Sequence, residues 1–188
     1  MTRRVQPDAA PADPEARVHD RHHQSLRLWL RLLTCTMMIE RAIRAGLRER
    51  FSTTLPRFDL MAQLERHPAG LRMGELSRRL MVTNANVTGV TDQLVADGLV
   101  ERIAVPEDRR AFAVRLTPRG KRSFDLMAAE HEQWIEALLA ELPARERDAL
   151  YALLGSLKTA VAGTQASVRS LVPQPPRDAR TPRLRRKA

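Results

Sequence analysis

Apolar residues recur at helical spacing over most of the chain. From about residue 22 to residue 50 they follow the i, i+3, i+4 pattern of an amphipathic helix. The stripe consists of Leu26, Trp29, Leu30, Leu33 and Met37. Because Leu28, Leu32 and Met38 widen it, this helix is predicted to pack against more than one partner.

Three shorter helices are predicted between residues 56 and 98. The first begins at Pro56, since proline is favoured in the first turn of a helix, and ends at Pro68 and Gly70. The second is short, with Met73, Leu76 and Leu80 facing inward. In the third, Thr83 is the predicted N-cap and Asp97-Gly98 the end. Its inward residues are Val87, Val90 and Leu94.

The period of the apolar residues then changes to 2, which indicates strands at about 100–105 and 111–116. With residues 106–110 as the loop, Glu101 faces Arg115 across the hairpin. Thr117 and Pro118 are typical of a helix start, and this long helix is predicted to end near Glu141. Pro143 opens a last helix that ends near residue 166.

The predicted fold is therefore mainly α: four helices, a β-hairpin and two further helices. A short helix, a tight turn, a second helix with a polar face and a hairpin form a winged helix-turn-helix domain. In that arrangement the second helix enters the major groove of DNA, and the hairpin wing reaches the neighbouring minor groove.

The helix predicted over residues 83–96 carries small hydrogen-bonding side chains on its solvent face. These candidate DNA-reading residues are Thr83, Asn84, Asn86, Thr88, Thr91 and Gln93, together with Val87. Asn and Gln can pair with adenine, and Thr can bind phosphate or contact a thymine methyl group. Gly89 allows a close approach to the partner. Alternatively, these residue types mark only capping and a turn.

The predicted hairpin tip carries four consecutive charges, from Glu107 to Arg110. Arg109 and Arg110 are expected at a minor groove or its phosphates, and Asp108 is expected to hold the shape of the tip. The alternative is a solvated polar turn. Further candidates for phosphate contacts are Ser77, Arg78 and Arg102.

The formal net charge of +10 permits an anionic partner, although residues 171–188 contribute +5 of it. Residues 1–21 and 167–188 are rich in Pro and charged residues, and both are predicted to be disordered. The basic tail could bind DNA nonspecifically, bind acidic lipid, or do neither.

Several classes of protein are disfavoured by what the chain lacks. No apolar run approaches the roughly 20 residues that span a bilayer, and the N-terminus has no segment of signal-peptide type. We therefore expect a cytoplasmic protein without a membrane partner. No catalytic set or phosphate-binding glycine loop is visible, so we expect neither an enzyme nor a cofactor.

Two possible reactive sites, a cysteine thiol and a group of histidines, are not expected to be functional. Cys35, the single cysteine, is flanked by Leu-Leu-Thr and Thr-Met-Met, which predicts a buried, inert thiol. His19, His22 and His23 lie in a segment without a Cys or carboxylate cluster, so they are expected to be solvated rather than metal ligands.

The segment from about 56 to 120, with the helices around it, resembles the MarR family of bacterial winged-helix transcription regulators. The family's wing pattern appears at Asp108, Arg110, Val114, Leu116, Thr117 and Gly120. The end of the recognition helix is similar at Val87, Thr88, Leu94 and residues 97–100. One departure is Gly89, where many members carry a basic residue. The resemblance covers residues 22–166.

The resemblance implies a homodimer with dimerisation helices at 22–50 and 118–166 and a DNA-binding lobe at 56–117. It further implies a repressor of a pseudo-palindromic operator in double-stranded DNA. Release would follow binding of a small effector between these parts, such as an aromatic acid or an acyl-CoA. Arg57 and Phe58 lie near the family's pockets, although Phe58 also suits the core.

A winged-helix module that docks a protein partner is the alternative function. The predicted Thr/Asn/Gln face favours DNA, because a protein-docking helix would present aromatic or aliphatic anchors.

Overall fold

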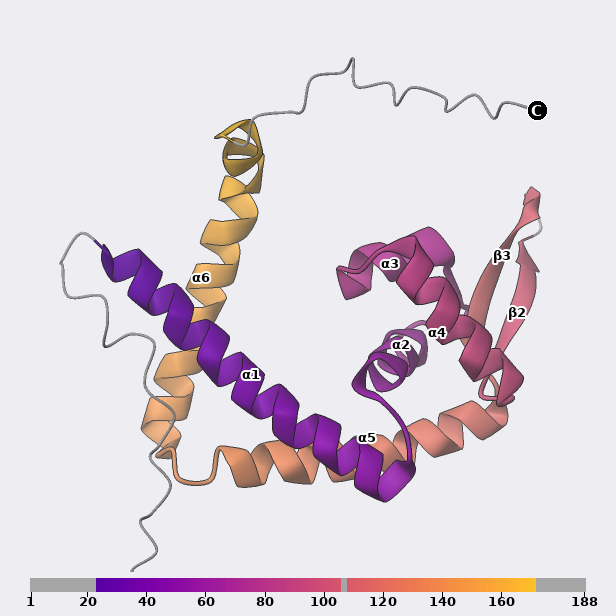
Figure 1. Ribbon diagram of the computed structural model, residues 1–188, viewed down its shortest axis with the longest axis horizontal. Helices are drawn as coiled ribbons and strands as arrows, with labels where there is room; N and C mark the ends of the chain where they lie inside the picture. The colour runs from indigo at the N-terminus through magenta and orange to yellow at the C-terminus, as the bar shows by residue number, and fades with distance from the viewer. Residues whose placement is uncertain (1–22, 106–107, 172–188) are drawn as a thin grey trace, which may run out of the picture. The chain divides into compact units, whose positions relative to one another are not determined.

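The computed structural model describes residues 23–105 and 108–171, with only the backbone described at residues 105, 108–111 and 165–171. In chain order its elements are α1 (Gln24–Phe51), α2 (Leu55–Glu65), β1 (Leu71–Arg72), α3 (Met73–Leu80), α4 (Asn84–Ala96), β2 (Val100–Val105), β3 (Asp108–Leu116), α5 (Pro118–Leu138) and α6 (Ala144–Leu171) (Figure 1). The chain divides into two compact units after Leu139, and α6 belongs to the second. The predicted mainly helical fold with a β-hairpin is confirmed.

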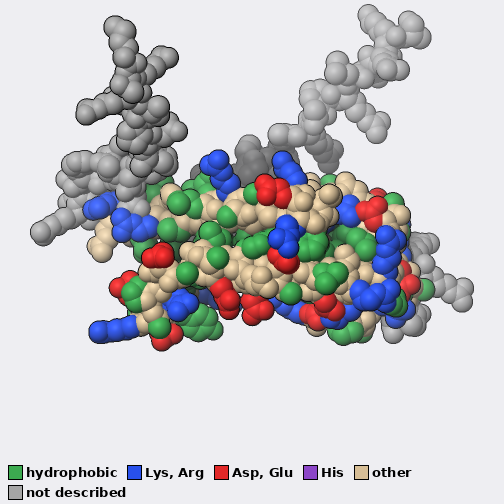
Figure 2. Space-filling view, turned by 90° about the horizontal axis from the view of Figure 1, so that it is seen from below, with side chains coloured by type: hydrophobic (Ala, Val, Ile, Leu, Met, Phe, Trp, Pro, Cys, Tyr) green, Lys and Arg blue, Asp and Glu red, His purple; other side chains and the backbone are tan. Residues whose placement is uncertain are grey.

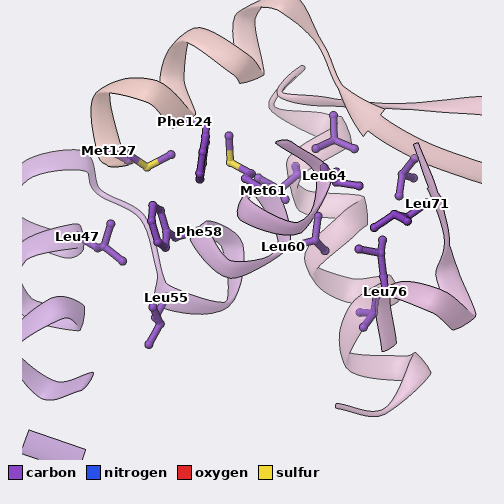
Figure 3. Packing of buried hydrophobic residues seen from close by; sticks show 14 of the residues in the cluster. Leu47, Leu55, Phe58, Leu60, Met61, Leu64, Leu71, Leu76, Phe124 and Met127 are labelled. Atoms are coloured by element: carbon purple, nitrogen blue, oxygen red, sulfur yellow. The ribbon is translucent and has the colours of Figure 1, made fainter. Parts of the chain in front are cut away.

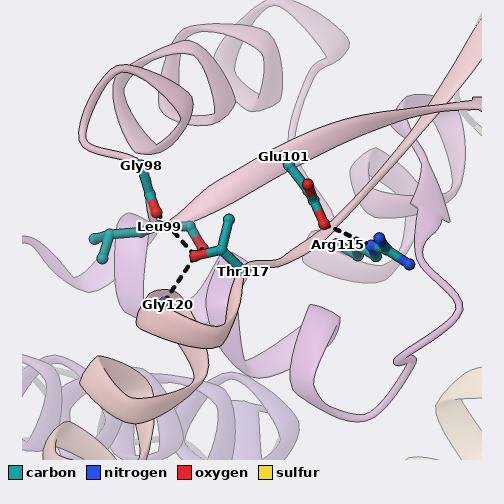
Figure 4. Close-up of polar contacts among 6 residues, drawn as sticks. All are labelled: Gly98, Leu99, Glu101, Arg115, Thr117 and Gly120. Carbon is teal, nitrogen blue, oxygen red and sulfur yellow. Dashed lines mark hydrogen bonds and ion pairs between the residues drawn. The ribbon is translucent and has the colours of Figure 1, made fainter.

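The hairpin belongs to a three-stranded antiparallel sheet of order β1-β3-β2. Glu101 pairs with Arg115 as predicted, and Arg115 Nε lies 2.7 Å from Glu101 Oε1 (Figure 4). The predicted loop over residues 106–110 was too long, because β3 begins at Asp108 and an irregularity shifts the register at Ala104/Val105. The third strand, β1, was not predicted; it pairs Leu71 with Val114.

The helix boundaries differ modestly from prediction. α5 ends at Leu138 instead of near Glu141, and α6 continues to Leu171, past the predicted end near residue 166. Residues 1–21 and 172–188, which were predicted to be disordered, lie outside the described residues. Among the helices that are described, none has the length and apolar character needed to cross a bilayer.

The start of α5 is fastened to the end of α4. Thr117 Oγ1 accepts a hydrogen bond from Gly120 N at 2.9 Å and donates one to the carbonyl oxygen of Gly98 at 2.8 Å (Figure 4). Gly98 has a φ of +67°, which suits glycine after a helix end. Gly120 packs so closely that a Cβ there would overlap the carbonyl oxygen of Leu99. These contacts hold the base of the wing against α4.

A continuous apolar core joins α2 to its neighbours in the first unit (Figure 3). On the side that faces α4, Leu60 of α2, Leu76 of α3 and Leu94 of α4 itself are fully buried. On the other side of α2, Phe58 stacks on Phe124 of α5 with ring centroids 5.5 Å apart. α1 meets α5 where Trp134 covers Gly46. The core therefore connects the two long helices of this unit to the helix-turn-helix.

Large apolar side chains nevertheless remain exposed on both long terminal helices. On α1, Trp29 is 57% exposed, Met37 61% and Met38 67%; on α6, Leu153 is 68% exposed. Figure 2 shows apolar side chains at the surface among Lys, Arg, Asp and Glu. Such surface usually marks a contact with another molecule.

Replacing Gly120 by Ala should lower the free energy of unfolding by more than about 3 kcal/mol, because the added methyl group overlaps backbone rather than a movable side chain. Gly74→Ala is the matched control, since a Cβ there meets no atom within 4 Å. Urea denaturation followed by circular dichroism measures both. Equal stabilities of the two variants would contradict the close approach of Gly120 to Leu99.

His131 should make the fold sensitive to mild acid. Its ring packs against Phe58 at 4.9 Å between centroids, and burial lowers its pKa below the ordinary value of 6.5. The unfolded chain then binds more protons, so the free energy of unfolding should fall as the pH drops below about 6.5. His131→Gln should reduce the change in the free energy of unfolding between pH 7.5 and 5.5, as measured by urea denaturation. An unchanged profile would exclude His131 as its source.

Candidate nucleic-acid interface

The turn between α3 and α4 is held by local hydrogen bonds. α3 ends at Met81, which adopts a left-handed conformation with φ +55°. Ser77 Oγ donates to the carbonyl oxygen of Val82 at 2.6 Å, and Thr83 caps α4 by accepting from Asn86 N. The N-cap prediction for Thr83 is confirmed. The single hydroxyl proton of Ser77 is used in this turn, and the predicted phosphate contact by Ser77 stays a prediction.

One side of α4 is buried and the opposite side is exposed. Thr91 is 0% exposed, so the prediction that its side chain lies on the solvent face is wrong. Val87 is 1% exposed, as its place among the inward residues predicted, so it is not free to contact DNA as the candidate list had it. Thr91 Oγ1 instead lies 3.9 Å from Met73 Sδ. Thr91 follows the inward Val87 by four residues, so the same helical periodicity could have placed Thr91 on the buried side. The remaining predicted residues are exposed: Thr83, Asn84, Asn86, Thr88 and Gln93.

The centre of the exposed side carries the smallest side chains. Helical geometry places Ala85, Gly89 and Ala96 opposite the buried Val87 and Leu94. Asn84 and Thr88 lie on one flank of this line, and Asn86 and Gln93 on the other. A Cβ at Gly89 would meet no atom within 4 Å, so internal packing does not require glycine there. The exposed side of α4 can therefore approach a partner closely with polar groups on either flank.

The wing is joined to α4 by Arg102. Its guanidinium pairs with Asp92 of α4 and lies 5.0 Å from the centroid of the Phe112 ring. The side chains of Asp108, Arg109 and Arg110 lie outside the described part, so their predicted contacts stay predictions. Arg78 is exposed in the last turn of α3 and stays a candidate for phosphate contact. Arg102 also stays a candidate for phosphate contact, although its guanidinium already pairs with Asp92.

Arg57 and Phe58 have separate roles in the structure. Arg57 pairs with Asp97 at the end of α4, and its Nε atom is buried without a hydrogen bond. Phe58 is a core residue, as the alternative interpretation held. Neither lines the cleft of about 570 Å³ that lies beside α4, which sequence analysis did not find.

The structure describes Cys35 and His23 but not His19 and His22. Cys35 is exposed in the chain, so the prediction that it is buried is wrong. In the described ranges no group of three or more His, Cys, Asp or Glu side chains is placed to hold a metal ion. His19 and His22 fall outside those ranges.

A winged helix-turn-helix with these contacts agrees with the comparisons to known proteins. The family model described as MarR family matches residues 53–112. A MarR family transcriptional regulator from Silicibacter pomeroyi of known structure is 34% identical, with a TM-score of 0.63 over 76% of this chain and 99% of that one. The chain belongs to the MarR family. Members of this family are transcriptional regulators rather than enzymes.

Other relatives match more narrowly. The HTH-type transcriptional repressor YetL of Bacillus subtilis is 35% identical over 83 residues, which are 44% of this chain. The matches to YetL and to the regulator YdgJ of the same organism span only 50% and 61% of those proteins. A MarR variant from E. coli complexed with operator DNA is 23% identical and shares the fold, with a TM-score of 0.65 over 74% of this chain and 99% of that one.

Replacing Gly89 by Ala should raise the free energy of unfolding by about 0.5–1 kcal/mol, because glycine disfavours a helix and the methyl group enters open space. Gly98→Ala should do the opposite, since its φ of +67° disfavours a side chain. Thermal denaturation of both variants measures the difference. Destabilisation by Gly89→Ala would show that internal packing requires this glycine.

Proposed function

We propose that the protein is a homodimeric repressor that binds a specific site in double-stranded DNA. The observation that carries this proposal is the exposed side of α4, where a line of small residues is flanked by Asn84, Asn86 and Gln93. A helix of this kind can lie deep in a major groove and present amide groups to base edges. Family membership supports the same role.

The exposed residues of α4 can contact different groups of the bases in the major groove, and the wing can contact the neighbouring minor groove. The amides of Asn84, Asn86 and Gln93 can pair with adenine. Thr88 Oγ1 donates to the carbonyl oxygen of Asn84 at 2.9 Å, which leaves the methyl group of Thr88 for thymine. Arg109 and Arg110 of the wing would reach a minor groove or its phosphates, with Asp108 supporting the tip.

The proposed homodimer accounts for the exposed apolar side chains of the terminal helices. Trp29, Met37 and Met38 of α1 and Leu153 and Leu154 of α6 would be covered by the second copy. Residues 22–50 and 118–166 would then serve dimerisation, and 56–117 would read DNA. Two-fold symmetry implies a pseudo-palindromic operator with half-sites about one helical turn apart.

The proposal also covers where the protein acts and how it is released from DNA. A regulator of transcription in a bacterial cell acts in the cytoplasm, where its DNA lies. Repression would be relieved by a small effector that binds beside the DNA-reading helix, and the cleft next to α4 offers a place for it.

A gel-shift titration against the DNA upstream of the protein's own gene, at two salt concentrations, tests DNA binding. Arg109→Ala/Arg110→Ala should weaken binding at least about tenfold and make the salt dependence shallower by roughly 0.9 for each phosphate that is no longer neutralised. Arg145→Ala/Arg147→Ala makes the same change in charge on exposed residues of α6 and should bind like the wild type.

Equally weakened binding by both double variants would mean that only bulk charge matters. Weak wild-type binding that is insensitive to Arg109 and Arg110 would favour a module that docks a protein partner.

A further inference from the structure

The cleft beside α4 is lined by residues of α1, α2, α3 and α4 and of the turn between α3 and α4. Its polar and charged lining residues are Glu40 and Arg44 of α1, Asp59 of α2, and Asn86 and Gln93 of α4. Its volume of about 570 Å³ lies within the range of small-molecule sites, roughly 300–1,000 Å³. A ligand here would touch the DNA-reading helix directly.

The charges that line the cleft do not cancel. Arg44 Nη2 lies 2.8 Å from Glu40 Oε2, one helical turn away, so these two side chains neutralise each other. Asp59 is the third charged residue of the lining, and the others that form it are uncharged. One negative charge is therefore left over in the cleft.

Asp59 is held in surroundings that disfavour its negative charge. Burial raises the pKa of its carboxyl group above the ordinary 3.8, and Glu40 raises it further, whereas Arg44 lowers it. A cation beside the Asp59 carboxylate would stabilise its negative charge, and the carboxylate would therefore favour binding of a cation. An anion would meet the unneutralised charge of Asp59.

Much of the rest of the lining is apolar and suits the apolar part of an organic molecule. Leu80, Val82 and Val90, none of which is fully buried, supply apolar surface on the α3 and α4 sides. Apolar walls with a few convergent polar groups are typical of sites for small molecules. A bare metal ion would leave this surface unused, so an amine attached to an apolar group fits the lining better.

We propose that this cleft binds a small organic cation, an aromatic or aliphatic amine whose ammonium group pairs with Asp59, and that this ligand is the effector of the protein. The proposal rests on the proposed DNA-binding function. It replaces the expected aromatic acid or acyl-CoA by a ligand of opposite charge. Asn86, Gly89 and Gln93 belong both to the cleft and to the exposed side of α4, so ligand and DNA compete for one helix flank.

The test compares two probes of similar shape and opposite charge, 2-phenylethylamine and phenylacetate, on the full chain. Titration is followed by amide NMR up to millimolar concentrations at pH 7.5, where both probes are ionised. Saturable shifts at Asp59, Asn86 and Gln93 are expected with the amine, and at least tenfold weaker binding with the acid. No saturable shift with the amine, or tighter binding of the acid, would overturn the proposal.

Asp59→Asn should weaken amine binding at least tenfold. Because this change removes a charge that the fold disfavours, the variant should remain folded. Asp125→Asn is the matched control, since Asp125 pairs with Lys121 on α5 and does not line the cleft. Equal amine binding by Asp59→Asn and the wild type would exclude Asp59 as the recognition group.

Gel-shift titrations with and without the amine separate this inference from the proposed function. The amine should weaken DNA binding by the wild type and not by Asp59→Asn. Unchanged DNA binding with a saturated cleft would overturn the effector role. If the wild type bound no DNA at all, the proposed function would fail, and the NMR titration would still decide whether the cleft binds amines.

Discussion

The orientation of the recognition helix, α4, depends on the burial of one of its sides against α2 and α3. Leu60, Leu64 and Leu76 meet Val87 and Leu94 in a core that excludes solvent almost completely. Truncating one such leucine typically costs about 2–5 kcal/mol, so rotation of α4 about its axis would be strongly unfavourable. The opposite side of the helix is exposed as a consequence, and the candidate DNA contacts and the cleft are arranged around it.

The wing is positioned relative to α4 by Val100 and Val114, which are buried in the same core, and by polar contacts. Thr117 binds the backbone at both Gly98 and Gly120, and Arg102 bridges from β2 to Asp92. At the same end of α4, Arg57 reaches from α2 to Asp97. The C-terminal end of the recognition helix is thereby tied to α2, β2 and the start of α5.

Local rules predicted the parts of the fold that depend on local chemistry. Thr83 and Thr117 are N-caps because a hydroxyl beside free amide groups is favourable, and Gly98 ends a helix because it tolerates a positive φ. β1 was missed because two residues form a strand only through pairing with β3. The pair of Arg57 with Asp97 and the cleft around Asp59 bring together residues far apart in sequence, so no local pattern indicates them.

The central claim is that a symmetric dimer presents two copies of the exposed side of α4 to DNA. Selection of binding sites from random duplex DNA, followed by hydroxyl-radical footprinting, tests it most directly. The account predicts an enriched pseudo-palindrome with half-sites centred about 10 base pairs apart, protected on one face of the duplex. No enriched sequence, or a single half-site without a symmetry mate, would contradict it.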